Sequence, residues 1–166
     1  MVPLAVGGGV RTLADFEATL RAGADKVVLG TAGVEDIDFV AAASRRFGAQ
    51  AVVVALDAVD ETGTEIAVQS GSRPTYRDAI GVARAVVEAG AGELLVQTVS
   101  QDGLLTGMNL ALIRAVSEAV SVPVVASSGA GGYQHLLEAI QAGADAVAAG
   151  AMFQFTEQTP RGARDY

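Results

Sequence analysis

Short apolar runs alternate with amphipathic stretches along almost the whole chain. The runs suit strands of a parallel sheet that is buried on both faces, and they cover residues 3–6, 26–29, 51–56, 93–99, 122–126 and 144–149. Between them, apolar residues recur at helical spacing, as at Leu13, Phe16 and Leu20. This alternation of strand and helix patterns predicts an α/β fold with a parallel sheet.

Four more amphipathic stretches supply the remaining helices. Their apolar stripes are Ile37, Val40 and Ala43; Ile80, Ala83 and Val87; Leu112, Val116 and Val120; and Leu136 with Ile140. A capping box of Thr12 and Asp15 opens the first helix, and Thr75 with Asp78 three residues later predicts the cap of the helix that carries Ile80.

One segment interrupts the alternation after the third apolar run. Residues 60–64, with the sequence DETGT, favour a turn, and residues 65–69 form a short β-rich stretch. We therefore expect a β-hairpin inserted after the third strand. No linker or change of composition divides the chain, so residues 1–166 are expected to form one domain.

Two parts of the chain repeat each other at a constant spacing. Pro3 and Pro123, Gly9 and Gly129, and Gly30 and Gly150 each lie 120 positions apart, and the tetrapeptide AGAD occurs at 22–25 and 142–145. Such a repeat is typical of units that face each other across a closed barrel of eight strands.

Glycines follow the strands in both repeats. A glycine at this place lets the backbone approach a phosphate group, and barrel enzymes carry such loops at the C-terminal face of the sheet. The alternative is that these glycines only make tight turns. Two phosphate sites predict a ligand with a phosphate at each end, and their expected residues are Gly8, Gly9, Gly30 and Thr31 for the first, and Gly103, Ser128, Gly129, Gly150 and Ala151 for the second.

Four charged residues mark the ends of predicted strands. Asp57 ends the run VVVALD and Asp102 follows ELLVQTVSQ, which predicts catalytic carboxylates. The alternatives are a capping or salt-bridged Asp57 and a turn-forming Asp102. Lys26 and Glu93 begin strands and are expected at the opposite face, where charges usually stabilise a barrel.

The composition narrows the chemistry. A net charge of −8 argues against nucleic acid or an anionic membrane surface as partner. The absence of cysteine fits a cytoplasmic protein and excludes a thiolate metal site. The sequence has neither metal-ligand spacing nor a G-x-G-x-x-G motif, so we expect no metal and no dinucleotide cofactor.

These motifs together resemble the cyclase subunit of imidazole glycerol phosphate synthase. The matching segments are VGGGVR at 6–11, AGADKV at 22–27, QAVVVALD at 50–57, GAGE at 90–93, the Asp-Gly pair at 102–103, ASSGAG at 126–131 and FQF at 153–155. The resemblance implies a TIM-type (β/α)8 barrel in which this chain supplies six βα units and lacks the first two. A further catalytic Asp of the family lies on its first strand, outside this chain.

The resemblance also implies a function. The family is a lyase of histidine biosynthesis, which cyclises a ribulosyl substrate with two phosphates and takes ammonia from a glutaminase subunit docked at the barrel bottom. Asp57 then matches one of the family's catalytic carboxylates, and Lys26 and Glu93 match charged residues at the ammonia entrance.

Departures from the family pattern leave alternatives open. Gly30 stands where the cyclase usually has Asn, and VLGTA at 28–32 resembles the sister isomerase of the pathway, although Lys26 and Glu93 argue against it. The segments 148–153 and 161–166 resemble a paralogue that supplies ammonia for surface-sugar amidination. Because six strands leave two open sheet edges, we also expect self-association through those edges.

Overall fold

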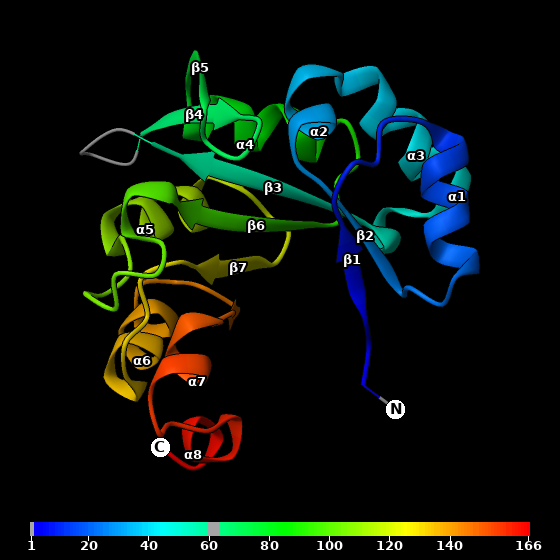
Figure 1. The fold of residues 1–166 in the computed structure, drawn as a ribbon. Helices are drawn as coiled ribbons and strands as arrows, with labels where there is room; N and C mark the ends of the chain where they lie inside the picture. The colour runs from blue at the N-terminus through cyan, green and yellow to red at the C-terminus, as the bar shows by residue number, and fades with distance from the viewer. Residues whose placement is uncertain (1, 60–63) are drawn as a thin grey trace.

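The strands form a parallel sheet that curls into a half-barrel, with helices packed outside it (Figure 1). The computed structural model describes residues 2–59 and 64–166, and within them the parallel strands follow the order β1-β2-β3-β6-β7-β8. These strands are Ala5–Gly7 (β1), Lys26–Leu29 (β2), Val52–Ala58 (β3), Glu93–Thr98 (β6), Val124–Ser127 (β7) and Ala146–Val147 (β8). The architecture is that of an incomplete TIM-type (β/α)8 barrel, as the sequence predicted.

Helices follow the strands in the expected alternation. They are Leu13–Arg21 (α1), Thr31–Glu35 (α2), Ile37–Phe47 (α3), Ala79–Glu88 (α4), Leu110–Ala119 (α5), Tyr133–Gln141 (α6), Ala151–Phe155 (α7) and Pro160–Asp165 (α8), with 3-10 turns at Ala49–Ala51 (η1) and Val99–Gln101 (η2). The capping box predicted for α1 is present, because the Thr12 hydroxyl accepts from the Asp15 N–H and the Asp15 carboxylate accepts from the Thr12 N–H. Hydrogen bonding by the Thr12 side chain, and then by the Arg11 backbone N–H, lowers the pKa of the Asp15 carboxyl.

A hairpin follows β3, as predicted, and it is longer than expected. Its strands are β4 (Glu65–Val68), which pairs antiparallel with β3, and β5 (Arg73–Asp78), which pairs antiparallel with β4. Residues 60–63 of the turn predicted at 60–64 lie outside the described residues. The cap predicted at Thr75 is wrong, because Thr75 lies in β5 and its hydroxyl donates to the Ile66 carbonyl across the hairpin. Asp78 instead caps α4 by accepting from the Gly81 N–H.

The 120-residue repeat is visible in the contacts that join each pair of strands. The Asp25 carboxylate accepts from the Leu4 N–H at 2.8 Å, and the Asp145 carboxylate accepts from the Val124 N–H at 2.9 Å. Each Asp therefore fixes the start of the strand before it in the same way. The shared sequence AGAD is thus partly explained by strand pairing.

The main core lies between the sheet and helices α1, α3, α4 and α5. Phe16, Val40, Val54, Leu94 and Val116 have no exposed surface there. Each fully buried side chain of this size contributes about 1.5–3 kcal/mol relative to an exposed one. A second cluster surrounds Met152 between β7, α6 and α7.

Two of the predicted helix stripes are partly wrong. In α4 the buried positions include Val82 and Val86, whereas Ile80 and Val87 are only half-buried. In α6 Ile140 is 43% exposed, and Ala139 takes the buried position instead. The predicted positions Ala83 and Leu136 are buried, so each stripe was right at one position and wrong beside it.

The end strands differ from the buried pattern that their apolar sequence predicted. In β1, Ala5 and Gly7 are exposed and Val6 is half-buried, and in β8 Ala146 is exposed. Each of these strands pairs on one side only within the described residues. In the part of the chain that the structure describes, no helix is both long and apolar enough to cross a membrane.

Candidate functional site

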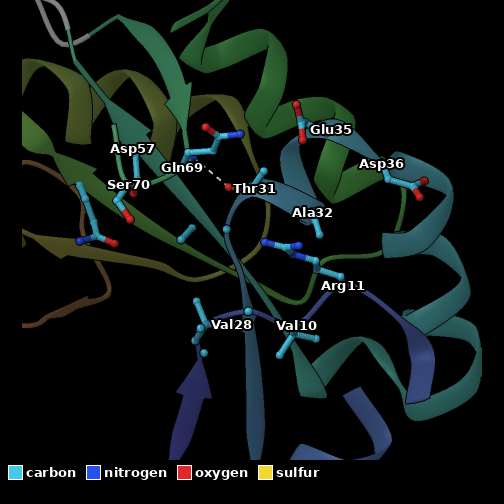
Figure 2. A pocket seen from close by; sticks show the side chains of 16 residues that line it. Val10, Arg11, Val28, Thr31, Ala32, Glu35, Asp36, Asp57, Gln69 and Ser70 are labelled. Atoms are coloured by element: carbon cyan, nitrogen blue, oxygen red, sulfur yellow. Dashed lines mark hydrogen bonds between the residues drawn. The ribbon is translucent and has the colours of Figure 1, made fainter. Parts of the chain in front are cut away.

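The C-terminal ends of β1, β2 and β3 open onto one cavity of about 970 Å³ (Figure 2). Its walls come from the two loops after β1 and β2, from the inner side of β3 and β6, and from the tip of the hairpin. The lining residues are Gly7, Gly8, Gly9, Val10, Arg11, Val28, Gly30, Thr31, Ala32, Glu35, Asp36, Ala55, Asp57, Gln69, Ser70 and Gln97. All residues predicted for the first phosphate site therefore lie in one cavity with Asp57.

The loop after β1 has a backbone that favours glycine. Gly8 and Gly9 have φ angles of 109° and 74°, in the left-handed region that other residues rarely adopt. A Cβ atom at either position would meet nothing within 4 Å. The backbone conformation, and not a lack of space for a side chain, explains why glycine suits these two positions. The open space beside them leaves the loop backbone accessible to a ligand.

Asp57 lies near the C-terminal end of β3 and is half-buried. Its neighbour in register on β6 is Gln97, which also lines the cavity. Burial raises the pKa of the Asp57 carboxyl, and the negative charge of Asp102 raises it further. A carboxyl whose pKa is raised in this way can hold a proton and give it up, which is what general acid–base catalysis needs.

Asp102 lies after β6 and lines a second, smaller pocket of about 30 Å³. This pocket gathers every residue predicted for the second phosphate site and lies between the loops after β6, β7 and β8. Its lining residues are Asp102, Gly103, Ser127, Ser128, Gly129, Ala130, Ala148, Ala149, Gly150 and Ala151. Asp57 and Asp102 line different pockets but lie near enough to interact electrostatically.

Ser128 has an unusual place in this second pocket. Its φ angle is 74°, and only 6% of the residue is exposed. Its hydroxyl oxygen has no hydrogen-bond partner among the described residues. A buried polar group without a partner is costly, so the Ser128 hydroxyl lowers the stability of the folded chain.

Lys26 and Glu93 lie at the opposite end of the strands. They begin β2 and β6, and their side chains form an ion pair across the start of β3. The two side chains are 35% and 18% exposed, so the pair is partly shielded from water. The structure thus separates this pair from the glycine loops along the length of the sheet.

Sequence reasoning missed three groups that line the large cavity: Arg11, Gln97 and the hairpin tip at Gln69 and Ser70. Arg11 lies beside Ala32 and Thr31 with its guanidinium directed into the cavity (Figure 2). Among the described residues it is the one Lys or Arg of the lining. Its position two residues after Gly9 was the available clue.

Two of the cavity's carboxylates are engaged in contacts of their own. Asp36 caps α3 by accepting from the Phe39 N–H, and Glu35 forms an ion pair with Arg73. Asp57 is therefore the carboxylate best placed to act on a ligand. The described residues include no group of three or more His, Cys, Asp or Glu side chains arranged to hold a metal ion.

Comparisons with known proteins find matches over almost the whole chain. A family model described as "Histidine biosynthesis protein" matches residues 1–159. The imidazole glycerol phosphate synthase subunit HisF of Mycobacterium bovis (strain BCG / Pasteur 1173P2) is 45% identical over 166 residues. That alignment covers 95% of this chain and 62% of the relative, so the chain spans less than two thirds of the relative's length.

Proposed function

The chain belongs to the histidine biosynthesis protein family, and we propose that it carries the cyclase site of an imidazole glycerol phosphate synthase. This lyase closes an imidazole ring on a ribulosyl substrate that has a phosphate at each end. The observation that carries the proposal is Asp57, a half-buried carboxyl with a raised pKa in the same cavity as a glycine loop. The 45% identity to a HisF subunit supports the assignment.

The two pockets are proposed to hold the two phosphates. The first phosphate takes hydrogen bonds from the backbone at Gly9 and Gly30 and from the Thr31 hydroxyl. The second is bound at Gly103, Gly129 and Gly150 together with Ser128 and Ala151, and Gly8 keeps the first loop open. Backbone N–H groups suit this task in a chain of net charge −8, because they attract an anion without adding cations.

Asp57 is proposed as the general acid and base. Attack of ammonia on a carbonyl carbon forms a C–N bond and leaves a proton on nitrogen, and the loss of water that follows requires a proton on the departing oxygen. A carboxyl with a raised pKa can take the first proton and return the second. Burial raises that pKa most, and the negative charge of Asp102 raises it further. The Asp102 carboxylate is proposed to accept a hydrogen bond from a substrate hydroxyl.

The strand-start end of the half-barrel is proposed as the ammonia entrance. The Lys26–Glu93 ion pair lies there, on the side of the sheet away from the phosphate loops. A glutaminase subunit docked on this end would release ammonia into the sheet interior toward Asp57.

We also propose that β1 and β8, which pair on one side only within the described residues, allow copies of the chain to associate.

The experiment measures ammonium-dependent conversion of the bisphosphorylated ribulosyl substrate. Relative to wild type, Asp57→Asn should abolish turnover while it leaves substrate affinity almost unchanged. Asp38→Asn on the exposed face of α3 should behave as wild type. Turnover that survives Asp57→Asn would refute the catalytic role. Tight binding without any turnover would favour the ammonia-delivering paralogue.

A further inference from the structure

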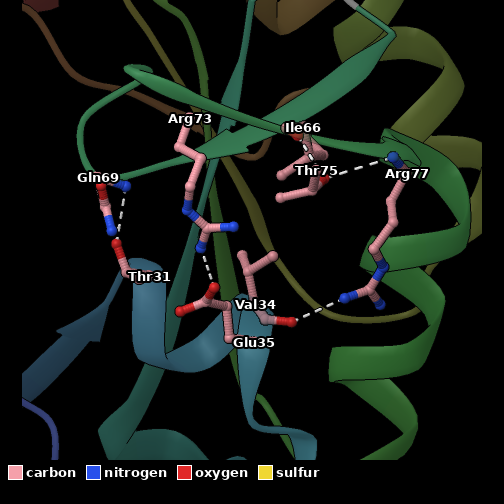
Figure 3. A network of polar contacts seen from close by, with 8 residues as sticks. All are labelled: Thr31, Val34, Glu35, Ile66, Gln69, Arg73, Thr75 and Arg77. Carbon is pink, nitrogen blue, oxygen red and sulfur yellow. Dashed lines mark hydrogen bonds and ion pairs between the residues drawn. The ribbon is translucent and has the colours of Figure 1, made fainter.

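The β4–β5 hairpin contacts helix α2, which follows β2, at three separate points (Figure 3). All three partners on the far side belong to α2. The contacts are the Gln69 N–H donating to Thr31 Oγ1 at 2.9 Å, the Arg73–Glu35 ion pair, and Arg77 Nη1 donating to the Val34 carbonyl oxygen at 2.9 Å. The hairpin therefore holds both the first and the last residue of this helix.

Helix α2 depends on such outside contacts. It has five residues, contains Gly33, and its N-cap Gly30 makes no side-chain capping bond. A helix of this length is not stable by itself in water. On the sheet side Val34 is 1% exposed, so packing fixes that face. On the solvent side, the hairpin supplies the contacts named above.

The hairpin tip adopts an uncommon backbone to make its contact. Gln69 and Ser70 have φ angles of 55° and 57°, in the left-handed region that few residues other than glycine occupy. Both residues line the large cavity. Strained backbone of this kind is retained where the surrounding structure requires it, often beside a functional site.

The bond from Gln69 has a consequence for the Thr31 hydroxyl. A hydroxyl carries one hydrogen and two lone pairs, and the Gln69 N–H occupies one of the lone pairs. The Thr31 hydrogen then remains available for a second group, and Thr31 lines the cavity. An oxyanion of a phosphate is the kind of acceptor that this hydrogen suits.

We propose that the β4–β5 hairpin is a positioning element for the first phosphate site. Through Gln69, Arg73 and Arg77 it fixes α2 and turns the Thr31 hydroxyl into a hydrogen-bond donor aimed at the substrate phosphate. This inference rests on the proposed function, because it assumes that the cavity binds a phosphate. It assigns Arg73 and Arg77 as positioning residues and gives them no contact with the substrate.

The Glu35→Ala variant distinguishes the positioning role of the hairpin from a simple electrostatic effect on phosphate affinity. Removing this half-exposed carboxylate takes a negative charge away from the cavity, so electrostatics alone would make phosphate bind more tightly. Loss of the ion pair to Arg73 should instead loosen α2 and weaken phosphate binding, by about twofold to fivefold for an exposed pair. The two explanations therefore predict opposite signs.

The assay is an NMR titration of the 166-residue chain with inorganic phosphate. The amides of Gly9, Gly30 and Thr31 report on the first site, and those of Gly103 and Gly129 report on the second. Weaker binding in Glu35→Ala and Arg73→Ala at the first site only, with Arg73→Lys close to wild type, supports the proposal. The control Asp38→Ala removes a carboxylate from the surface of α3 and should change neither site.

A measurement without phosphate tests the proposal independently. Hydrogen exchange of the Gly33 and Val34 amides, which bond to the Gly30 carbonyl, should be faster in Glu35→Ala and Arg73→Ala than in Asp38→Ala. Unchanged exchange, or tighter phosphate binding in Glu35→Ala, overturns the positioning role. If exchange is faster but wild-type chain shows no phosphate shift at Gly30, the proposed function fails and the phosphate-positioning role fails with it.

Discussion

Replacing Ser128 with glycine is expected to stabilise the folded chain and to weaken phosphate binding at the second site. Ser128 has a φ of 74°, and a left-handed conformation costs a non-glycine residue roughly 1–2 kcal/mol. Removing its buried hydroxyl, which has no partner among the described residues, relieves a further cost of about 1–3 kcal/mol. Glycine adds about 0.5–1 kcal/mol of chain entropy to the unfolded state, which opposes these gains.

The net expectation is a stabilisation of about 2 kcal/mol. For a domain of this size that corresponds to a rise in Tm of about 4–8 °C. The phosphate affinity of the second site should fall at the same time, by about tenfold if the hydroxyl donates one hydrogen bond to an anion. Opposite changes in stability and binding are the signature of strain kept for a ligand.

Thermal melts with and without inorganic phosphate measure both effects in one experiment. Ser128→Ala is the matched control, because it removes the hydroxyl but keeps a Cβ in the left-handed conformation. It should lose the same phosphate affinity and gain less stability than Ser128→Gly. A Ser128→Gly chain that melts lower than wild type, or that binds phosphate equally well, would refute the reasoning.

Three further predictions follow from the site and the fold. Burial and the charge of Asp102 raise the pKa of Asp57 in the folded state, so ionisation of this carboxyl opposes folding. The stability that the protonated carboxyl contributes is present in acid and is lost as the pH rises through the raised pKa. Asp57→Asn should therefore raise Tm more at neutral than at acid pH, and an equal effect at both would contradict the burial. Arg11→Gln should weaken phosphate binding at the first site several-fold in low salt and less in high salt, whereas Arg114→Gln on exposed α5 should not. Analytical ultracentrifugation should detect concentration-dependent association through β1 and β8, and a monodisperse monomer at micromolar concentration would disprove it.

The parallel strands could be predicted because their pattern is local. Residues 51–56 form an uninterrupted apolar run, which is typical of a strand with both faces buried. The 120-residue repeat located both glycine loops. The strand β5 could not be predicted in this way. Its sequence RPTYRD is polar, contains proline and stays mostly exposed, since β5 pairs only with β4 among the described strands.

The wrong cap at Thr75 and the missed cavity residue Gln69 both result from tertiary contacts of the hairpin. Thr75 and Asp78 have the spacing of a capping box, but hairpin pairing places Thr75 in a strand and uses its hydroxyl there. Gln69 reaches Thr31 only because the hairpin folds back over α2, a contact between residues 38 positions apart. Local sequence carries no trace of such contacts, so it located the glycine loops and the carboxylates but missed the side chains brought in by tertiary folding.

The central claim is that one ligand spans the two glycine sites past Asp57. It is tested most directly by a crystal structure of the chain with a non-reactive analogue of the bisphosphorylated substrate. The account predicts one phosphate at Gly9, Gly30 and Thr31, the other at Gly103, Gly129 and Gly150, and the reacting carbons beside the Asp57 carboxyl. A ligand with both phosphates outside these loops, or one that leaves Asp57 out of contact, would contradict it.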